Sequence, residues 1–132
     1  MRDLVPRVVV VAAVIEIDGR FLLSRRLAGT HLAGTWEFPG GKCEPGESHE
    51  GCLTREIREE LDVEAVVGDE VLTVEHDYPE RHVRLHFRRC AIGGVPSAML
   101  GQELRGVPRE ELGSIDVPPA DRVLVARLAR GE

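Results

Sequence analysis

The chain of 132 residues is 42% hydrophobic, 4% aromatic and 30% charged, and its formal net charge is −6. This length and hydrophobic content favour a single domain over residues 1–132 with one core. The acidic charge and the few aromatic side chains argue against a nucleic-acid polymer as ligand, because a phosphate backbone attracts a basic surface and unpaired bases stack on aromatic rings.

Apolar runs and cysteines indicate the cellular setting. No apolar run approaches the roughly 20 residues of a membrane span, and the N-terminus lacks the charged-then-apolar pattern of a secretory signal. The three cysteines, Cys43, Cys52 and Cys90, are odd in number and match no zinc or disulfide spacing. We therefore expect a cytoplasmic protein without membrane contact, whose cysteines are small apolar fillers.

The N-terminal part reads as two strands and a basic loop. A β-branched run predicts a strand buried on both faces over Arg7–Ile17. Asp18-Gly19 is a hairpin signal, and Arg20–Arg25 is the predicted returning strand. The segment Arg25–His31 follows as a basic loop.

A loop and a helix form the central stretch. Three glycines and a proline within seven residues predict a loop over Gly40–Gly46. Leu53, Ile57 and Leu61 then recur every four residues, which predicts a helix with one apolar stripe that ends near Leu61. Ser48 is placed to cap this helix, because its hydroxyl oxygen can accept from the free amides of the first turn.

Three carboxylates share one face of this helix. Glu56, Glu59 and Glu60 stand at i, i+3 and i+4, where side chains are surface neighbours. Like charges this close repel, so they need Arg55, which can pair with Glu59, or a divalent cation such as Mg²⁺. The alternative is a solvated face with ion pairs, which is the usual role of a helix rich in glutamate and arginine.

The second half of the chain begins with strands. Val63–Val67 and Val71–His76 are predicted strands separated at Gly68-Asp69, and Tyr78–Arg81 is a predicted turn. The segment His82–Ile92 reads as an antiparallel strand. Its inward residues are Val83, Leu85 and Phe87, and its outward residues are His82, Arg84, His86 and Arg88.

A loop, a short strand and a helix complete the chain. Gly93–Gly101 reads as loop, Glu103–Val107 as a short strand, and Pro108–Leu112 as one helical turn. Pro118-Pro119 opens a last helix that runs to about Ala129, with Leu124 and Leu128 buried. This order of elements favours an α+β or α/β sandwich.

The central stretch closely resembles the signature of the Nudix hydrolases, which are Mg²⁺- or Mn²⁺-dependent enzymes that cleave nucleoside diphosphates linked to another group. The matching residues are Gly41, Glu47, Arg55-Glu56-Ile57, Glu59-Glu60 and Asp62-Val63. Asp62 stands where the family has glycine, at a left-handed helix end that Asp tolerates better than most residues. The resemblance implies a mixed β-sheet packed between helices.

Flanking segments resemble the MutT branch, whose members hydrolyse nucleoside triphosphates to the monophosphate and pyrophosphate. These segments are Trp36–Lys42, Tyr78–His82 and Pro118–Asp121. The resemblance implies that Mg²⁺, or Mn²⁺, is bound by the Gly40 carbonyl and the carboxylates of Glu56, Glu59 and Glu60. Glu56 is the first candidate for the base that takes a proton from water, with Glu59 and Glu60 as alternatives.

The resemblance also implies supporting and substrate-binding residues. Glu47 and Arg55 would brace the loop, which includes Gly41, against the helix. Arg26 and His31 would contact the phosphates; without the resemblance they read equally well as an exposed basic loop.

Tyr78, Arg81 and Asp121 fall where the branch lines its base site. MutT has Asn at the position of Asp121. An ionised Asp121 would suit an exocyclic amino group, whereas a protonated one could also read an oxidised guanine. The alternative role of Asp121 is to meet the dipole in the first turn of the last helix.

Two further positions depart from the MutT-like pattern. Relatives carry a further glutamate where this chain has Leu100, and Gly106 stands where a tryptophan is common. The next carboxylate, Glu103, enters the site only if the chain shifts locally; otherwise it is a plain surface residue.

The sequence therefore predicts a nucleoside triphosphate pyrophosphohydrolase that acts on 8-oxo-dGTP or a modified (d)CTP. Two alternatives remain: a non-catalytic Nudix-fold module that binds a nucleotide, and a hydrolase of another diphosphate derivative such as ADP-ribose. The expected partner is a small nucleotide, and the pattern leaves monomer or homodimer open.

Overall fold

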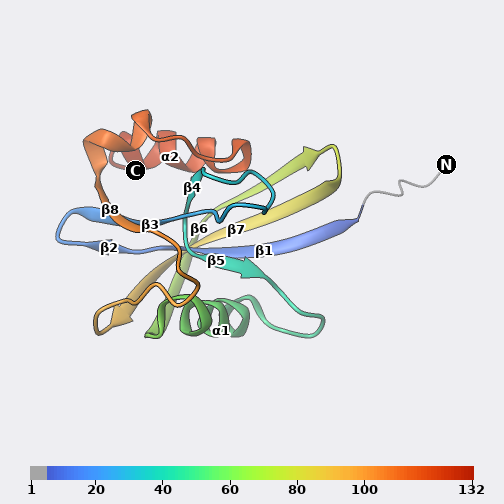
Figure 1. Cartoon of the computed structure of the whole chain (residues 1–132), viewed down its shortest axis with the longest axis horizontal. Coiled ribbons are helices and arrows are strands. Elements are labelled where there is room, and N and C mark those ends of the chain that lie inside the picture. The colour runs from blue at the N-terminus through green and yellow to red at the C-terminus, as the bar shows by residue number, and fades with distance from the viewer. Residues whose placement is uncertain (1–5) are drawn as a thin grey trace.

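The computed structural model describes residues 6–132 (Figure 1), so the first five residues of the predicted domain lie outside the described part. The strands are β1 (Arg7–Val14), β2 (Glu16–Ile17), β3 (Arg20–Arg25), β4 (Trp36–Glu37), β5 (Gly40–Lys42), β6 (Glu64–Tyr78), β7 (Arg81–Gly93) and β8 (Leu104–Pro108). The helices are α1 (His49–Leu61) and α2 (Arg122–Ala129), with 3₁₀ turns η1 (Arg109–Ser114) and η2 (Pro119–Asp121).

Two sheets organise these elements. The first has the strand order β5-β1-β7-β6 and is mixed, because β1 pairs parallel with β7 and antiparallel with β5. The second joins β2, β3 and β4, and β8 pairs with β3. Figure 1 shows α1 on one side of the sheets and α2 on the other. The predicted mixed sheet between helices is therefore confirmed. Neither α-helix within residues 6–132 has the length and apolar character needed to cross a membrane.

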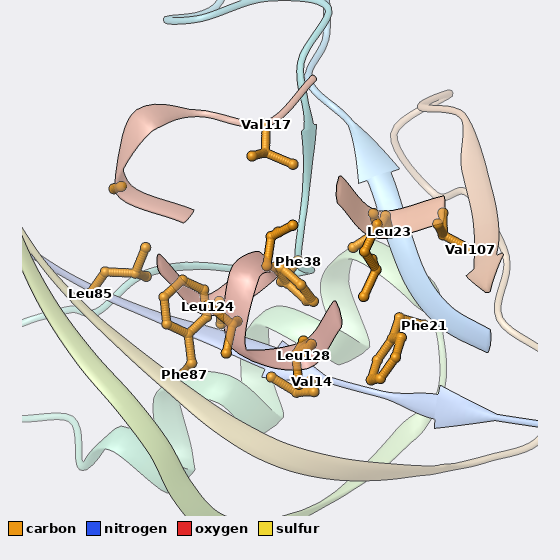
Figure 2. Close-up of a cluster of buried hydrophobic side chains, with 14 of the residues drawn as sticks. Val14, Phe21, Leu23, Phe38, Leu85, Phe87, Val107, Val117, Leu124 and Leu128 are labelled. Carbon is orange, nitrogen blue, oxygen red and sulfur yellow. The ribbon is translucent and has the colours of Figure 1, made fainter. Parts of the chain in front are cut away.

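Strand β1 divides the core into two clusters, because successive side chains of a strand point to opposite faces. Val11 and Ala13 pack on the α1 side with Leu53, Ile57 and Leu61 of the helix. Ala12 and Val14 pack on the α2 side, in the cluster of Figure 2. That second cluster also contains Phe21, Leu23, Phe38, Leu85, Phe87, Leu124 and Leu128.

Helix α1 begins and ends as its sequence predicts. The Ser48 hydroxyl accepts from the Gly51 N–H at 3.0 Å, and Leu53, Ile57 and Leu61 are fully buried. Asp62 ends the helix in the left-handed conformation at φ 55°, and its N–H donates to the Arg58 carbonyl at 3.0 Å. Asp62 therefore takes the conformation that glycine would take at this position.

Three expectations about strands need correction. The Arg7–Ile17 run is divided between β1 and β2, which belong to different sheets, and Val9 in it is 37% exposed. The two strands predicted around Gly68-Asp69 are one strand, β6, because register shifts against β7 absorb the extra residues. His86, predicted to face solvent, is only 6% exposed because the His49 ring of α1 packs against it.

The cysteines also differ from the prediction. Cys43 and Cys52 form a disulfide, with Cα atoms 5.3 Å apart, because the loop after β5 folds back onto the first turn of α1. Cys90 is free and buried, and burial raises the pKa of its thiol to about 11. Only Cys90 therefore matches the predicted role of an apolar filler.

Candidate active site

An ion-pair network braces the loop after β5 against α1. The Arg55 guanidinium donates to both carboxylate oxygens of Glu47, at 2.7 and 2.8 Å, and to the Lys42 carbonyl at 3.3 Å. The Glu44 N–H donates to Glu47 at 2.8 Å. Together the Arg55 and Glu44 hydrogen bonds lower the pKa of Glu47 to about 2. Glu47 therefore stays ionised, and the predicted brace is present.

The first residues of the predicted Gly40–Gly46 loop form strand β5, which approaches its neighbours so closely that a side chain at Gly40 or Gly41 would displace them. A Cβ atom on Gly41 would lie 2.3 Å from the carboxyl carbon of Glu56. A Cβ atom on Gly40 would lie 2.1 Å from the Val11 carbonyl oxygen of β1. The absence of a side chain at Gly41 is what makes room for the carboxylate of Glu56.

Glu56 and Glu60 lie together on this face of α1. Burial first, and then the charges of Glu56 and Glu37, raise the pKa of Glu60 well above its ordinary value, against a backbone hydrogen bond from Gly40. The Glu56 carboxylate also accepts from Arg55 at 2.9 Å. Two adjacent carboxylates in a partly buried position repel each other, and a divalent cation offsets that repulsion as well as a proton does.

Glu59 stands apart from this pair. Its side chain is 57% exposed and accepts from Arg55 at 3.2 Å, the i,i+4 pairing that the sequence predicts. Among residues 6–132, one group of possible metal-binding side chains has ligand atoms that all lie within 4.8 Å of one another. That group does not include Glu56, Glu59 or Glu60. The fold thus places Gly40, Glu56 and Glu60 together, with Glu59 at the solvent side.

Arg26 and His31 are held in place by their neighbours. The Arg26 guanidinium donates to Glu37 at 2.8 Å and to the His31 carbonyl. The His31 ring lies 2.6 Å from Glu80 through Nδ1, while its buried Nε2 has no hydrogen-bond partner among residues 6–132. The segment is therefore a partly buried wall of a cavity, and differs from the exposed basic loop of the alternative interpretation.

The three residues predicted for the base site surround one cavity of about 100 Å³. Tyr78, Arg81 and Asp121 line it together with Arg26 and His31. The Tyr78 ring meets the His31 ring edge-on at 4.8 Å, and its hydroxyl accepts from the Ala120 N–H at 3.2 Å. The fold thus brings together side chains from η2, from the adjoining ends of β6 and β7, and from the loop after β3.

A second cavity of about 220 Å³ lies between this region and strand β5. It shares Arg26, Glu37, Arg81 and Asp121 with the first cavity, and it reaches Gly40 and Gly41. A ligand that extends through both cavities meets Asp121 and, at Gly41 of β5, the strand beside Glu56.

Asp121 is a buried acid, with 5% of its surface exposed. Burial first, and then the charge of Glu37, raise its pKa from 3.8 to about 8, while Arg26 and a hydrogen bond from the Phe38 backbone act in the opposite direction. At neutral pH the carboxyl is therefore mainly protonated, and it offers both an O–H donor and a carbonyl acceptor.

Glu103 and Leu100 do not add a carboxylate to the α1 group. Glu103 is exposed and pairs with Arg25 at 3.0 Å. Leu100 is 55% exposed, and its N–H donates to Gln102 at 2.9 Å. Gln102 is buried, and its amide donates to the Glu60 carbonyl at 3.1 Å. The segment from Leu100 to Glu103 therefore contacts the end of α1 through the side-chain amide of Gln102.

Sequence reasoning missed two residues of the site, Glu37 and Gln102. Glu37 lies between the two cavities, pairs with Arg26, and has a pKa that burial raises against the effect of Arg26. The sequence contains a signal for Glu37, because this residue lies in the Trp36–Lys42 segment that resembles the MutT branch. Gln102 has no such signal, because its role depends on the loop after β7 returning to α1.

Comparison with known proteins agrees with this geometry. A family model described as "NUDIX domain" matches residues 10–127. The CTP pyrophosphohydrolase of Escherichia coli is 49% identical over 92% of this chain and 94% of its own length. The 8-oxo-dGTP diphosphatase of the same organism is 32% identical over 86% of this chain and 88% of its own length.

A solved structure shows the same arrangement of elements. The crystal structure of the MutT protein from Methanosarcina mazei is similar with a TM-score of 0.88 and 27% sequence identity. The similarity covers 98% of this chain and 98% of that chain.

Proposed function

This chain belongs to the Nudix family and is a MutT-like hydrolase, and from that premise we propose that it hydrolyses a cytosine nucleoside triphosphate to the monophosphate and pyrophosphate. The substrate is CTP, dCTP or a modified form of either. The 49% identity with a CTP pyrophosphohydrolase over nearly the full length of both chains supports a cytosine nucleotide over an oxidised guanine nucleotide.

The 49% identity carries the choice of a cytosine nucleotide, and the buried, protonated Asp121 in the cavity is compatible with that choice. Its O–H can donate to the ring nitrogen N3 of cytosine while its carbonyl oxygen accepts from the adjacent amino group, which is a donor. Both hydrogen bonds are made away from water, where an unpaired partner is costly. Tyr78 and Arg81 line the same small cavity and contact the base from its sides.

The triphosphate extends through the second cavity toward the loop after β5. Family members use divalent metals, and we propose Mg²⁺, or Mn²⁺, held by the Gly40 carbonyl and by Glu56, Glu59 and Glu60. The bound cation offsets phosphate charge and lowers the pKa of a coordinated water. Glu56 is the proposed base for that water, and Arg55, which donates to it at 2.9 Å, orients its carboxylate. Arg26 and His31, on the cavity wall, contact the phosphates.

A second candidate substrate is 8-oxo-dGTP. Two observations favour it: the 32% identity with an 8-oxo-dGTP diphosphatase, and the protonation of Asp121. Oxidation of guanine at C8 places a hydrogen on N7 beside the O6 acceptor. A carboxyl group that both donates and accepts fits this pair of atoms and rejects unoxidised guanine, whose N7 and O6 are both acceptors.

The test is a substrate panel with Mg²⁺ that contains CTP, dCTP, 5-methyl-dCTP, 5-hydroxy-dCTP, 8-oxo-dGTP, dGTP and ADP-ribose. Monophosphate and pyrophosphate are both quantified. We expect the highest kcat/KM for a cytosine nucleotide, and loss of turnover by at least about 100-fold in Glu59→Gln because one metal ligand is lost. Glu50→Gln is the matched control, since Glu50 is an exposed glutamate of the same helix outside the site.

Preference for 8-oxo-dGTP would move the assignment to the second candidate. Release of inorganic phosphate in place of pyrophosphate would refute the proposed reaction, and equal activity of Glu59→Gln and Glu50→Gln would refute the proposed metal ligands.

A further inference from the structure

Two histidines and a glutamate from three elements meet on the α1 side of the mixed sheet. They are His49, the first residue of α1, Glu70 of β6 and His86 of β7. The potential ligand atoms of these three side chains all lie within 4.8 Å of one another. None of the three belongs to the loop or to the carboxylate face described above.

A register shift in β6 creates this group. His86 of β7 lies opposite Thr73, and Arg88, on the same face as His86, lies opposite Glu70. A regular strand would bring residue 71 to this face, because side chains alternate. The shift between Glu70 and Leu72 brings Glu70 there in its place, which is the way in which a β-bulge redirects a side chain.

The contacts within the group are close. Nδ1 of His86 lies 2.7 Å from the Glu70 carboxylate and 3.1 Å from the Thr73 hydroxyl. The ring centroids of His49 and His86 are 4.1 Å apart. His86 is buried whereas Glu70 is exposed, so the group has a fixed inner side and an open outer side. The nearby cation Arg88 donates to the Gly68 carbonyl at 2.9 Å.

We propose that His49, Glu70 and His86 bind a transition-metal ion of the Zn²⁺ type. Two imidazoles and one carboxylate are a ligand set that suits Zn²⁺, which sits about 2.0–2.2 Å from such ligands and leaves a fourth position to water. Ligand atoms on one such ion lie about 3–4 Å apart, so small side-chain rotations close the group around it. Mg²⁺ prefers oxygen ligands and does not compete well for imidazoles.

The proposed zinc site is separate from the active site. Glu56, the nearest of the α1 carboxylates, is seven residues from His49, which corresponds to roughly 10 Å along the helix axis. An ion at His49 joins the start of α1 to β6 and β7. It therefore stabilises the folded protein by mass action, because the unfolded chain lacks the assembled ligands.

Isothermal titration with Zn²⁺ tests this assignment in a Glu56→Gln/Glu59→Gln background, which weakens metal binding by the carboxylates. We expect one equivalent of Zn²⁺ to bind and the Tm to rise with Zn²⁺ concentration. Added to this background, His49→Ala and Glu70→Gln should each weaken the binding by about tenfold or more, because each removes a ligand. Both residues are less buried than His86, so their replacement preserves the fold, which the Tm without zinc verifies.

The matched control is His82→Ala in the same background. His82 is also a β7 histidine bonded to two carboxylates, those of Asp77 and Glu75, but it lies outside the group. Its replacement should leave Zn²⁺ affinity unchanged. The assignment is overturned if the background variant binds no Zn²⁺, if His49→Ala and Glu70→Gln bind it as the background does, or if His82→Ala abolishes binding. These readouts are independent of hydrolysis, so they stand whatever the substrate panel shows.

Discussion

At the scale of single residues, Asp121 combines the base site with the electrostatics of the fold. Its carboxyl group is buried beside Glu37, and the positive charge of Arg26 offsets the effect of burial only in part. An ionised Asp121 would therefore add a second negative charge to a buried region. The folded protein avoids this by keeping the proton on Asp121.

This proton makes stability depend on pH. The folded pKa is about 8 and the ordinary value is 3.8. Below pH 3.8 the folded and the unfolded protein both hold the proton on Asp121, and the stabilisation is fully present. Between pH 3.8 and pH 8 only the folded protein holds it, so the free energy of unfolding falls as the pH rises. The loss is about 1.4 kcal/mol per pH unit. Asp121→Asn should abolish this loss. The Tm of Asp121→Asn relative to that of the parent protein should therefore rise from pH 4 to pH 8.

Asp69→Asn is the control for this experiment, because Asp69 is exposed. Parallel Tm curves for the parent and Asp121→Asn across that range would show that Asp121 is ionised in the folded protein.

Gly41 is a second residue whose identity has a direct physical reason. Gly41→Ala places a methyl group 2.3 Å from the carboxyl carbon of Glu56, so the carboxylate must move. Displacement of a catalytic group by about 1 Å can reduce the rate by about 100-fold, and we expect a loss of kcat/KM of that order. The control is Gly113→Ala, since within the described part of the chain no atom beyond its chain neighbours lies within 4 Å of a Cβ atom at that position. Equal kcat/KM for the two variants would contradict the proposed place of Glu56.

At the scale of elements, the disulfide and the Arg55 network hold the same loop against α1. The disulfide Cys43–Cys52 closes a short loop, with a sequence separation of 9. The network joins Arg55 of the helix to Glu47 and Lys42 of the loop. A covalent link and charge-assisted hydrogen bonds thus limit the motion of the segment that contains Gly40 and Gly41.

Reduction of the disulfide should destabilise the protein. The loop-closure entropy for about ten residues corresponds to roughly 2–3 kcal/mol of unfolding free energy. We expect dithiothreitol to lower the Tm of the parent protein and to leave that of Cys43→Ser/Cys52→Ser unchanged. Thiol titration in denaturant checks the premise: one free thiol, that of Cys90, is expected before reduction and three after it. Three free thiols before reduction would refute the disulfide.

At the scale of the whole molecule, the two sheets and two helices place segments that are distant in sequence around connected cavities. Residues 26–37 form one wall, the adjoining ends of β6 and β7 a second and η2 a third. The proposed zinc site uses the other face of the mixed sheet, beneath the start of α1. One sheet thereby supports two separate groups of polar side chains.

Local patterns account for what could be predicted. The hairpin at Asp18-Gly19, the extent of α1 and its caps at Ser48 and Asp62 all depend on neighbouring residues, and all are confirmed. The Glu47–Arg55 pair was predictable because the Nudix signature spans loop and helix. The roles of Glu56, Glu59 and Glu60 as metal ligands stay a prediction.

The predictions from the sequence were wrong where contacts between distant segments decide the structure. The outward assignment of His86 assumed that one face of β7 meets solvent, but the His49 ring of α1 packs against His86 there. The cysteine pairing depends on the return of the loop to α1, and the continuity of β6 depends on its pairing with β7. None of these contacts leaves a periodic signal in its own segment.

The sequence by itself determined the helix with its carboxylates, the glycine loop and the family, because these depend on residues within one short stretch. Only the tertiary structure decided the protonation of Asp121, the partners of Arg26 and the meeting of His49, Glu70 and His86. The physical reason is that burial and the proximity of charges are set by segments far apart in the chain, and these effects control pKa and ligand geometry.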